Sequence, residues 1–184
     1  MKYRCIVPLL VALKFFSNNG TYSETSCYRL INGGRYLHPS NGYDPTNHYL
    51  HLAALSSNMT ALTVWMFLPT EPSCFQLCNV QTGLYLMVDL NDLAYTLATH
   101  QMSSYTTTSF AFGPYYPLWP EKPQDALIKS LLKSYHLCRS FDEQSTNADE
   151  QLIRAISNPP ATAATPACQW HIQPTTCPTV TSCS

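Results

Sequence analysis

Aromatic and aliphatic residues alternate with polar residues in short runs along much of the chain, most clearly within residues 74–114. Phe75 and Leu77 fall on one face of the first run there, and residues 84–88 form a second run after a turn-like segment at residues 81–83. A period of two is typical of β-strands, in which successive side chains point to opposite faces. The pattern therefore predicts short strands joined by tight turns.

Two short patterns each occur three times at a similar interval. One is an aromatic residue two positions before a leucine, and the other is aromatic, any residue, apolar, any residue, proline. The first pattern is found at Tyr28 and Leu30, Phe75 and Leu77, and Tyr135 and Leu137, and the second at residues 65–69, 110–114 and 170–174. The intervals between the aromatic residues are 65 − 28 = 37, 110 − 75 = 35 and 170 − 135 = 35. This spacing predicts three homologous units.

One segment between the second and third units has a different period. Residues 115–123 are too rich in proline for an interior strand and predict a surface connection. In residues 124–134 the apolar side chains fall on one face at helical spacing; they are Leu127, Ile128, Leu131 and Leu132. The spacing predicts one short amphipathic helix on the outside of the domain.

The composition is that of a single domain with little charge. A chain of 184 residues with 45% hydrophobic residues can bury one sizeable core. Only 11% of its residues are charged and the formal net charge is −1. No basic field is present to attract nucleic acid or an anionic membrane, and no run is long and apolar enough to span a bilayer. We therefore expect neither a nucleic-acid partner nor a membrane span.

The N-terminal residues 1–20 resemble a secretory signal peptide, with Lys2 and Arg4 before an apolar run at residues 5–13. Lys14 interrupts the apolar stretch and no Ala-x-Ala cleavage site follows, so a frayed terminus or a buried first strand is the alternative. Eight cysteines in a chain of this length favour disulfides and an extracellular address. The acceptor triplets for N-glycosylation that begin at Asn19 and Asn58 agree with that address.

The spacing of the cysteines leaves their connectivity open. Cys74 and Cys78 are four residues apart on one predicted strand, which is too far for a mutual disulfide, so we expect them to have separate partners. The tail at residues 175–184 is rich in Ser and Thr and contains Cys177 and Cys183. It is expected to be flexible unless a disulfide holds it.

Several short segments resemble the repeats of ricin-B-type β-trefoil lectins. They are YRLIN at 28–32 with RYL at 35–37, FQLCN at 75–79 with GLYL at 83–86, and WHI at 170–172. The resemblance covers about residues 27–174. It implies an all-β chain with a single β-trefoil domain of three homologous units, to which the predicted helix between units two and three is an addition. It also implies a protein that binds glycans.

The resemblance implies one sugar site. Such repeats usually carry a glutamine two residues before the closing aromatic, but this chain has Thr63, Thr108 and Cys168 there. The family's aspartate after the second strand of a repeat is matched only by Asp89, and the first unit has Ser40 at the aligned place. Asp89 is therefore the candidate for binding the sugar hydroxyls, with Tyr95 or His100 stacked on the ring. In the alternative interpretation, Asp89 caps the turn at Asn91 and Asp92, and Tyr95 fills the core.

Other patterns give little support for an active site. His48 and His51 lie three apart on a predicted strand, where they point to opposite faces, and no cysteine pair has metal-binding spacing. Cys138 near His136, and the acidic pairs at 142–143 and 149–150, do not by themselves form a catalytic arrangement. We therefore predict no metal, no cofactor and no enzymatic activity.

A second function class remains open beside carbohydrate binding. The predicted loops at residues 38–47, 113–123 and 157–167 are long enough to present a protein-binding surface. A trefoil scaffold with such loops is compatible with a secreted protease inhibitor or effector, in which the fold positions a loop and no sugar pocket is needed.

Overall fold

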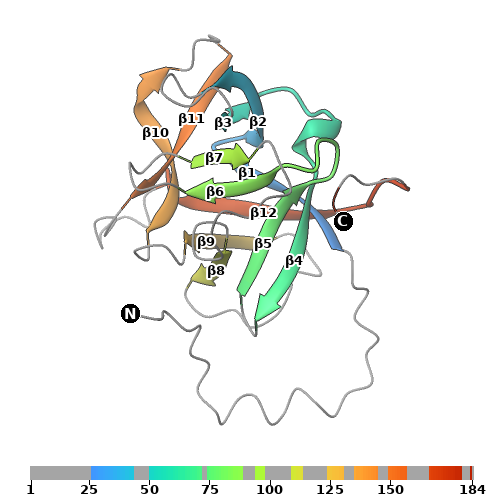
Figure 1. The fold of residues 1–184 in the computed structure, drawn as a ribbon. Helices are drawn as coiled ribbons and strands as arrows, with labels where there is room; N and C mark the ends of the chain where they lie inside the picture. Colours follow the sequence, from blue (N-terminus) through green and yellow to red (C-terminus); the bar gives the residue numbers. More distant parts are fainter. Residues whose placement is uncertain are drawn as a thin grey trace, which may run out of the picture.

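The computed structural model describes residues 26–43, 50–71, 74–88, 94–97, 109–113, 124–130, 135–144, 149–156, 166–179 and 183. This part of the chain is all-β, as predicted, and its only helical element is the short 3-10 turn η1 (Ala61–Thr63) (Figure 1). The strands are β1 (Ser26–Asn32), β2 (Arg35–Tyr43), β3 (Leu50–Ser56), β4 (Trp65–Glu71), β5 (Cys74–Asn79), β6 (Tyr85–Val88), β7 (Ala94–Leu97), β8 (Ser109–Gly113), β9 (Gln124–Ser130), β10 (His136–Gln144), β11 (Glu150–Ile156) and β12 (Gln169–Thr175).

Six of the strands close into an antiparallel ring. β1 pairs with β4, β4 with β5, β5 with β8, β8 with β9, β9 with β12, and β12 returns to β1. Closure leaves no strand of the ring with an unpaired edge. The remaining strands form the hairpins β2–β3, β6–β7 and β10–β11, which gather at one end of the ring (Figure 1).

The register divides the chain into three units of four strands: unit 1 is β1–β4, unit 2 is β5–β8 and unit 3 is β9–β12. In each unit the first and fourth strands pair at the same point, where the closing aromatic lies opposite an opening residue. These pairs are Tyr28 with Trp65, Phe75 with Phe110, and Ala126 with Trp170. The threefold repetition is therefore present in the backbone pairing as well as in the sequence.

The third unit corrects two predictions. Residues 124–130, predicted to begin a helix, form strand β9, and the unit opens at Ala126 and Ile128 instead of at Tyr135 and Leu137. Ala126 and Ile128 are buried and Asp125 is exposed, as expected for a period of two. The ring needs a strand between β8 and β12, and pairing with both outweighs the helical spacing of the apolar residues. Residues 131–134 lie outside the described part.

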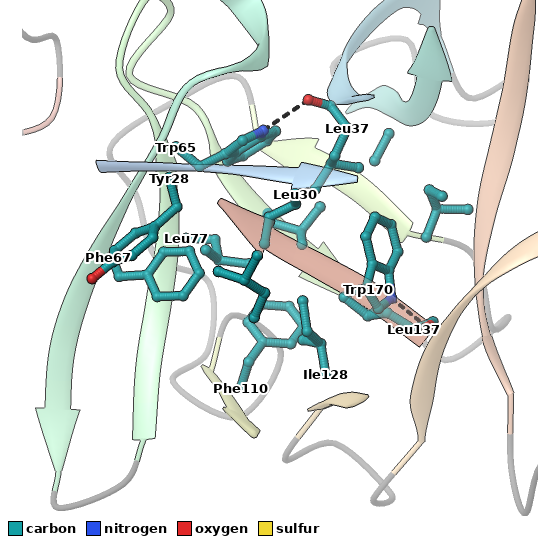
Figure 2. Close-up of a cluster of buried hydrophobic side chains, with 14 of the residues drawn as sticks. Tyr28, Leu30, Leu37, Trp65, Phe67, Leu77, Phe110, Ile128, Leu137 and Trp170 are labelled. Carbon is teal, nitrogen blue, oxygen red and sulfur yellow. Dashed lines mark hydrogen bonds between the residues drawn. The ribbon is translucent and has the colours of Figure 1, made fainter. Parts of the chain in front are cut away.

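A single apolar core fills the ring and the underside of the hairpins (Figure 2). The aromatic and leucine residues of the repeated patterns are buried in it, except for Tyr135, which is partly buried and packs against it; the buried ones are Tyr28, Leu30, Trp65, Phe75, Leu77, Phe110, Leu137 and Trp170. Both tryptophans donate their indole N–H to a backbone carbonyl of the second strand of their own unit. Trp65 Nε1 lies 2.9 Å from Leu37 O, and Trp170 Nε1 lies 2.8 Å from Leu137 O.

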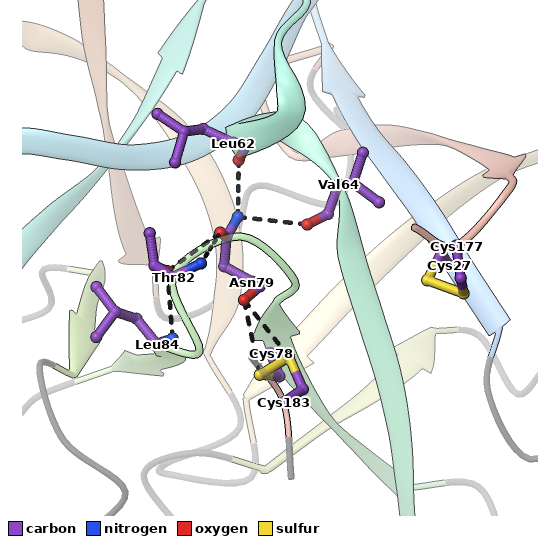
Figure 3. The surroundings of a disulfide bond; sticks show 9 residues. All are labelled: Cys27, Leu62, Val64, Cys78, Asn79, Thr82, Leu84, Cys177 and Cys183. Carbon is purple, nitrogen blue, oxygen red and sulfur yellow. Dashed lines mark hydrogen bonds between the residues drawn. A yellow bond between two sulfur atoms is a disulfide. The ribbon is translucent and has the colours of Figure 1, made fainter. Parts of the chain in front are cut away.

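Two buried asparagines connect neighbouring units, a feature that the sequence patterns did not predict. Asn79 Nδ2 donates to the carbonyls of Leu62 and Val64, at 2.7 and 3.3 Å (Figure 3). Asn32 Nδ2 donates in the same way to Ala167 and Gln169, at 2.8 and 3.1 Å. In each case the two carbonyls belong to the residues three positions and one position before the closing tryptophan of the neighbouring unit. Each asparagine amide therefore satisfies two backbone acceptors of another unit.

Three disulfides join described residues of the domain, which confirms the expectation that most of the cysteines are oxidised. They join Cys27 to Cys177, Cys78 to Cys183 and Cys138 to Cys168, and Cys74 is also disulfide-bonded. Cys74 and Cys78 therefore have separate partners, as predicted. The first two bonds attach tail residues to β1 and β5 (Figure 3), beside a second apolar cluster formed by Cys27, Val64, Met66 and Val80.

The first predicted loop is shorter than the sequence suggested. β2 continues through residues 38–43, and its pairing with β3 is irregular between Pro39 and Tyr43. A bulge of this kind is one of the few places where a strand accepts a proline. No helix in the described part of the chain is long and apolar enough to cross a bilayer.

Candidate functional site

Of the predicted sugar-site residues, only Tyr95 belongs to a described strand. Asp89 and His100 lie outside the described residues, and Tyr95 is described only through the backbone of β7. Val88, the last residue of β6, pairs with Ala94, the first residue of β7. Along the chain, Asp89 follows Val88 and Tyr95 follows Ala94.

Strand β3 of unit 1 lies on the other side of β7. Leu52 pairs with Tyr95, and His51 pairs with Thr96. The surroundings of the second unit's hairpin therefore include a strand from the first unit. The sequence of unit 2 alone does not predict that β3 lies beside β7, because this pairing depends on how the three hairpins are arranged. His51 lies on a strand and not on a helix, as expected, whereas His48 is outside the described part.

The position of Asp89 in its unit can be compared with the other units by counting along the chain. Leu37, Leu86 and Leu137 are each buried in the core and paired with the returning strand of their hairpin, so we take them as equivalent residues of β2, β6 and β10. Three residues after each leucine come Ser40, Asp89 and Ser140. The position that is acidic in unit 2 is therefore serine in units 1 and 3, in agreement with the alignment of Ser40.

Both of these serines are buried. The carbonyl of Ser40 lies 3.1 Å from His51 Nδ1, and that of Ser140 accepts a hydrogen bond from Gln151 Nε2 at 2.6 Å. In units 1 and 3, a side chain near the start of the third strand thus contacts the irregular backbone of the second strand. Units 1 and 3 use this position for structural hydrogen bonds, and only unit 2 has a carboxylate in its sequence there.

The structure also brings together a buried polar cluster that the sequence analysis missed. Glu150, from β11 of unit 3, lies against β2 of unit 1, where Ser40 Oγ donates to its Oε2 at 2.5 Å and His38 Nε2 lies 3.4 Å from its Oε1. The backbone N–H of Gly42 donates to Ser40 Oγ at 2.9 Å. Residues 38 and 150 are 150 − 38 = 112 positions apart, and only the pairing of β11 with β3 brings them together.

The order of groups in this cluster does not suit nucleophilic catalysis. In a serine hydrolase the imidazole stands between the hydroxyl and the carboxylate, so that it takes the proton of the hydroxyl. Here the carboxylate of Glu150 stands between Ser40 and His38. The Ser40 hydroxyl donates to the carboxylate, and the His38 imidazole contacts the carboxylate instead of the hydroxyl. The cluster instead ties unit 1 to unit 3. Among the described residues no three His, Cys, Asp or Glu side chains lie together as a metal site would require.

Burial controls the ionisation of two histidines. Burial lowers the pKa of His38 from the usual 6.5, although the charge of Glu150 and a hydrogen bond with the backbone of Pro39 oppose the change. Burial and then the positive charge of Lys129 lower the pKa of His136. Both histidines are therefore expected to be neutral at pH 7 in the folded protein.

We expect acid to destabilise the fold through His38. Below about pH 6.5 an unfolded chain binds a proton at this histidine more readily than the folded chain does, so the free energy of unfolding falls as pH falls. His38→Gln should reduce that slope between pH 6.5 and 5, by at most about 1.4 kcal/mol per pH unit. Urea denaturation at several pH values measures it.

His171→Gln is the matched control, because the His171 ring is exposed and lies 2.8 Å from Asp125. An equal change of slope in this control would show that burial of His38 is not the cause. A steeper acid loss in His38→Gln would contradict the sign of the effect, because it would mean that attraction to Glu150 outweighs burial.

No protein-family model and no curated protein sequence matches this chain. Among solved structures, the SDF2-like protein from Arabidopsis thaliana is similar with a TM-score of 0.62 and 12% identity, over 80% of this chain and 91% of that one. ThreeFoil, a designed threefold-symmetric protein, has a TM-score of 0.57 and 13% identity, over 80% and 97% of the two chains. At these identities the likeness shows the fold alone.

A lectin is also among the similar structures. The Polyporus squamosus lectin, solved with a human-type influenza-binding epitope, has a TM-score of 0.57 and 11% identity. The match covers 84% of this chain and 50% of the lectin chain, so this chain corresponds to half of the lectin's length.

Proposed function

We propose that this chain is a secreted β-trefoil of the ricin-B-like kind, which binds carbohydrate and catalyses no reaction. The observation that carries the proposal is the threefold arrangement of strands, together with a sequence in which Asp89 follows the core leucine of unit 2 at the interval at which the buried Ser40 and Ser140 follow those of units 1 and 3. The closed ring of six strands, the three hairpins and the likeness to a lectin support the fold and the function. The three disulfides support an extracellular or secretory address.

In the proposed site Asp89 accepts hydrogen bonds from two adjacent sugar hydroxyls, while Tyr95 or His100 covers the apolar face of the ring. Charge-assisted hydrogen bonds of this kind fix the orientation of the hydroxyls, and the aromatic contributes the apolar contact. A single shallow site of this kind should bind a monosaccharide weakly, with a Kd of roughly 1 mM. Glycans with several copies of the ligand would bind more tightly to an immobilised or oligomeric protein.

We expect Asp89→Asn to weaken glycan binding at least about tenfold, because the amide keeps the size of the side chain but loses the charge that strengthens both hydrogen bonds. A glycan array identifies the ligand, and titration calorimetry or NMR then compares the two proteins. Asp125→Asn, on the exposed face of β9, removes the same charge elsewhere and should leave binding unchanged. Unchanged affinity in a folded Asp89→Asn variant would show that this site is assigned wrongly.

Binding of a protein partner through surface loops is the second candidate. Of the three predicted loops, residues 38–43 of the first belong to β2, and the other two lie almost wholly outside the described residues. A panel of proteases tested beside the glycan array separates the two functions. Inhibition of a protease without binding of any glycan would favour the loop-based function.

A further inference from the structure

The connection between β3 and η1 is an exposed segment that contains a possible attachment site for a glycan. Residues 57–60 are all exposed, and Met59 retains 60% of its accessible surface, unlike the other large hydrophobic side chains that the structure describes. These four residues contain the triplet Asn58, Met59 and Thr60, which has the pattern of an N-glycosylation acceptor. The triplet therefore lies in a surface segment of the fold.

The backbone of this segment is held at both ends while its acceptor side chains are left available. The N–H of Asn58 donates to Ser56 Oγ at 3.1 Å, and the carbonyl of Thr60 accepts from Thr63 N at 3.2 Å and Thr63 Oγ1 at 2.7 Å. Thr60 has an extended backbone, with φ −127° and ψ −179°, and its side chain makes no capping bond. Within the described part of the chain, no hydrogen bond occupies the carboxamide of Asn58.

Exposure decides whether an asparagine of this fold is compatible with a glycan. Asn32 and Asn79 are buried, and their amides bond to carbonyls of a neighbouring unit, so a hydrated sugar on either would prevent folding. Asn58 has neither constraint. A glycan there projects into solvent and costs the fold no buried hydrogen bond.

We propose that Asn58 carries an N-linked glycan. The donor is an oligosaccharide linked to a polyprenyl diphosphate. The Asn58 Nδ2 forms a bond to C1 of the first sugar while the bond from C1 to the phosphate oxygen breaks, the diphosphate leaves with its electron pair, and the amide proton passes to a base of the transferase. Transfer requires that the chain enter the secretory pathway, but it does not require that the protein bind carbohydrate.

The glycan would stand apart from the sugar site proposed on unit 2. On β3, Leu52 pairs with Tyr95 of β7, and Ser56, the last residue of the strand, lies two residues before Asn58. Four steps of about 3.3 Å separate Leu52 from Ser56 by about 13 Å. The glycan would leave the β6–β7 hairpin accessible and would cover the exposed Met59, an apolar side chain that would otherwise contact solvent.

The test is expression of the full chain, with its own N-terminus, in a eukaryotic cell that secretes proteins. We expect secreted protein whose gel mobility increases after treatment with peptide N-glycosidase, which also converts Asn58 to aspartate in the mass spectrum. Asn58→Gln and Thr60→Ala should each remove the Asn58 glycan, whereas Thr60→Ser should retain it. Asn19→Gln tests the other triplet separately.

Two outcomes would overturn the proposal. One is secreted protein in which the peptide with Asn58 is unmodified, and the other is a chain that does not enter the secretory pathway. Loss of glycan binding in Asp89→Asn has no bearing on this modification. The array should include Asn58→Gln protein, so that binding by the unit 2 site is measured without a glycan of the chain's own.

Discussion

Replacing Trp170 with alanine should lower the free energy of unfolding by about 3–5 kcal/mol, which would bring a domain with a stability of about 5 kcal/mol close to unfolding. Trp170 is completely buried, and its indole N–H donates to Leu137 O at 2.8 Å. The substitution creates a cavity between β12 and β10 and also leaves a buried carbonyl without its donor. Urea denaturation followed by far-UV circular dichroism measures the loss.

Two further variants separate these contributions. Trp170→Phe fills much of the cavity but cannot donate to Leu137, so it should cost about 1–3 kcal/mol. His171→Ala changes the exposed neighbour on the same strand and should change stability by no more than about 0.5 kcal/mol. A cost below about 1 kcal/mol for Trp170→Ala would contradict the arrangement of the core around this side chain.

The success of the repeat prediction has a physical cause. Tyr28 and Phe75 lie opposite Trp65 and Phe110, so each opening aromatic is paired across two strands with the aromatic that closes its unit. Large side chains at both positions are needed to fill the ring. Aromatic residues that recur at a fixed interval therefore indicate which strands pair, so the first two units could be predicted from the sequence.

The third unit shows why the same reasoning fails where the side chain is small. Ala126 occupies the position of Tyr28 and Phe75, and no aromatic marks it. The interval of 35 from Tyr135 to Trp170 matched the other units by coincidence, because Tyr135 lies between β9 and β10. The apolar residues of segment 124–134 also have helical spacing, which predicts a helix where the structure has a strand. Only the closure of the ring reveals β9.

The parts of the candidate sites that could not be predicted from the sequence depend on contacts between different units. Glu150 reaches His38 and Ser40 because β11 pairs with β3, and Asn79 reaches Val64 because β4 pairs with β5. No local period encodes such contacts. The alignment of Ser40 with Asp89, by contrast, depends only on counting along each repeat and can be proposed from the sequence.

Removing the disulfide between Cys27 and Cys177 should destabilise the protein by about 4 kcal/mol. With Cys78–Cys183 intact, this bond closes a loop of about 57 residues, made of 78 − 27 = 51 and 183 − 177 = 6. The chain-entropy relation gives about 4 kcal/mol for such a loop and about 3.5 kcal/mol for the 30-residue separation of Cys138 and Cys168. Cys27→Ala with Cys177→Ala, compared with Cys138→Ala with Cys168→Ala, measures both.

The first of these double variants should cost more than loop entropy alone predicts. Cys27 and Cys177 pack in the second apolar cluster with Val64 and Met66, so freeing the tail also exposes apolar surface on β4. Denaturation should therefore show a loss at or above about 4 kcal/mol for this pair, with binding of a hydrophobic dye before global unfolding. If all the cysteines of protein from its native source are free thiols, the disulfides are absent, and both this prediction and the secretory address are wrong.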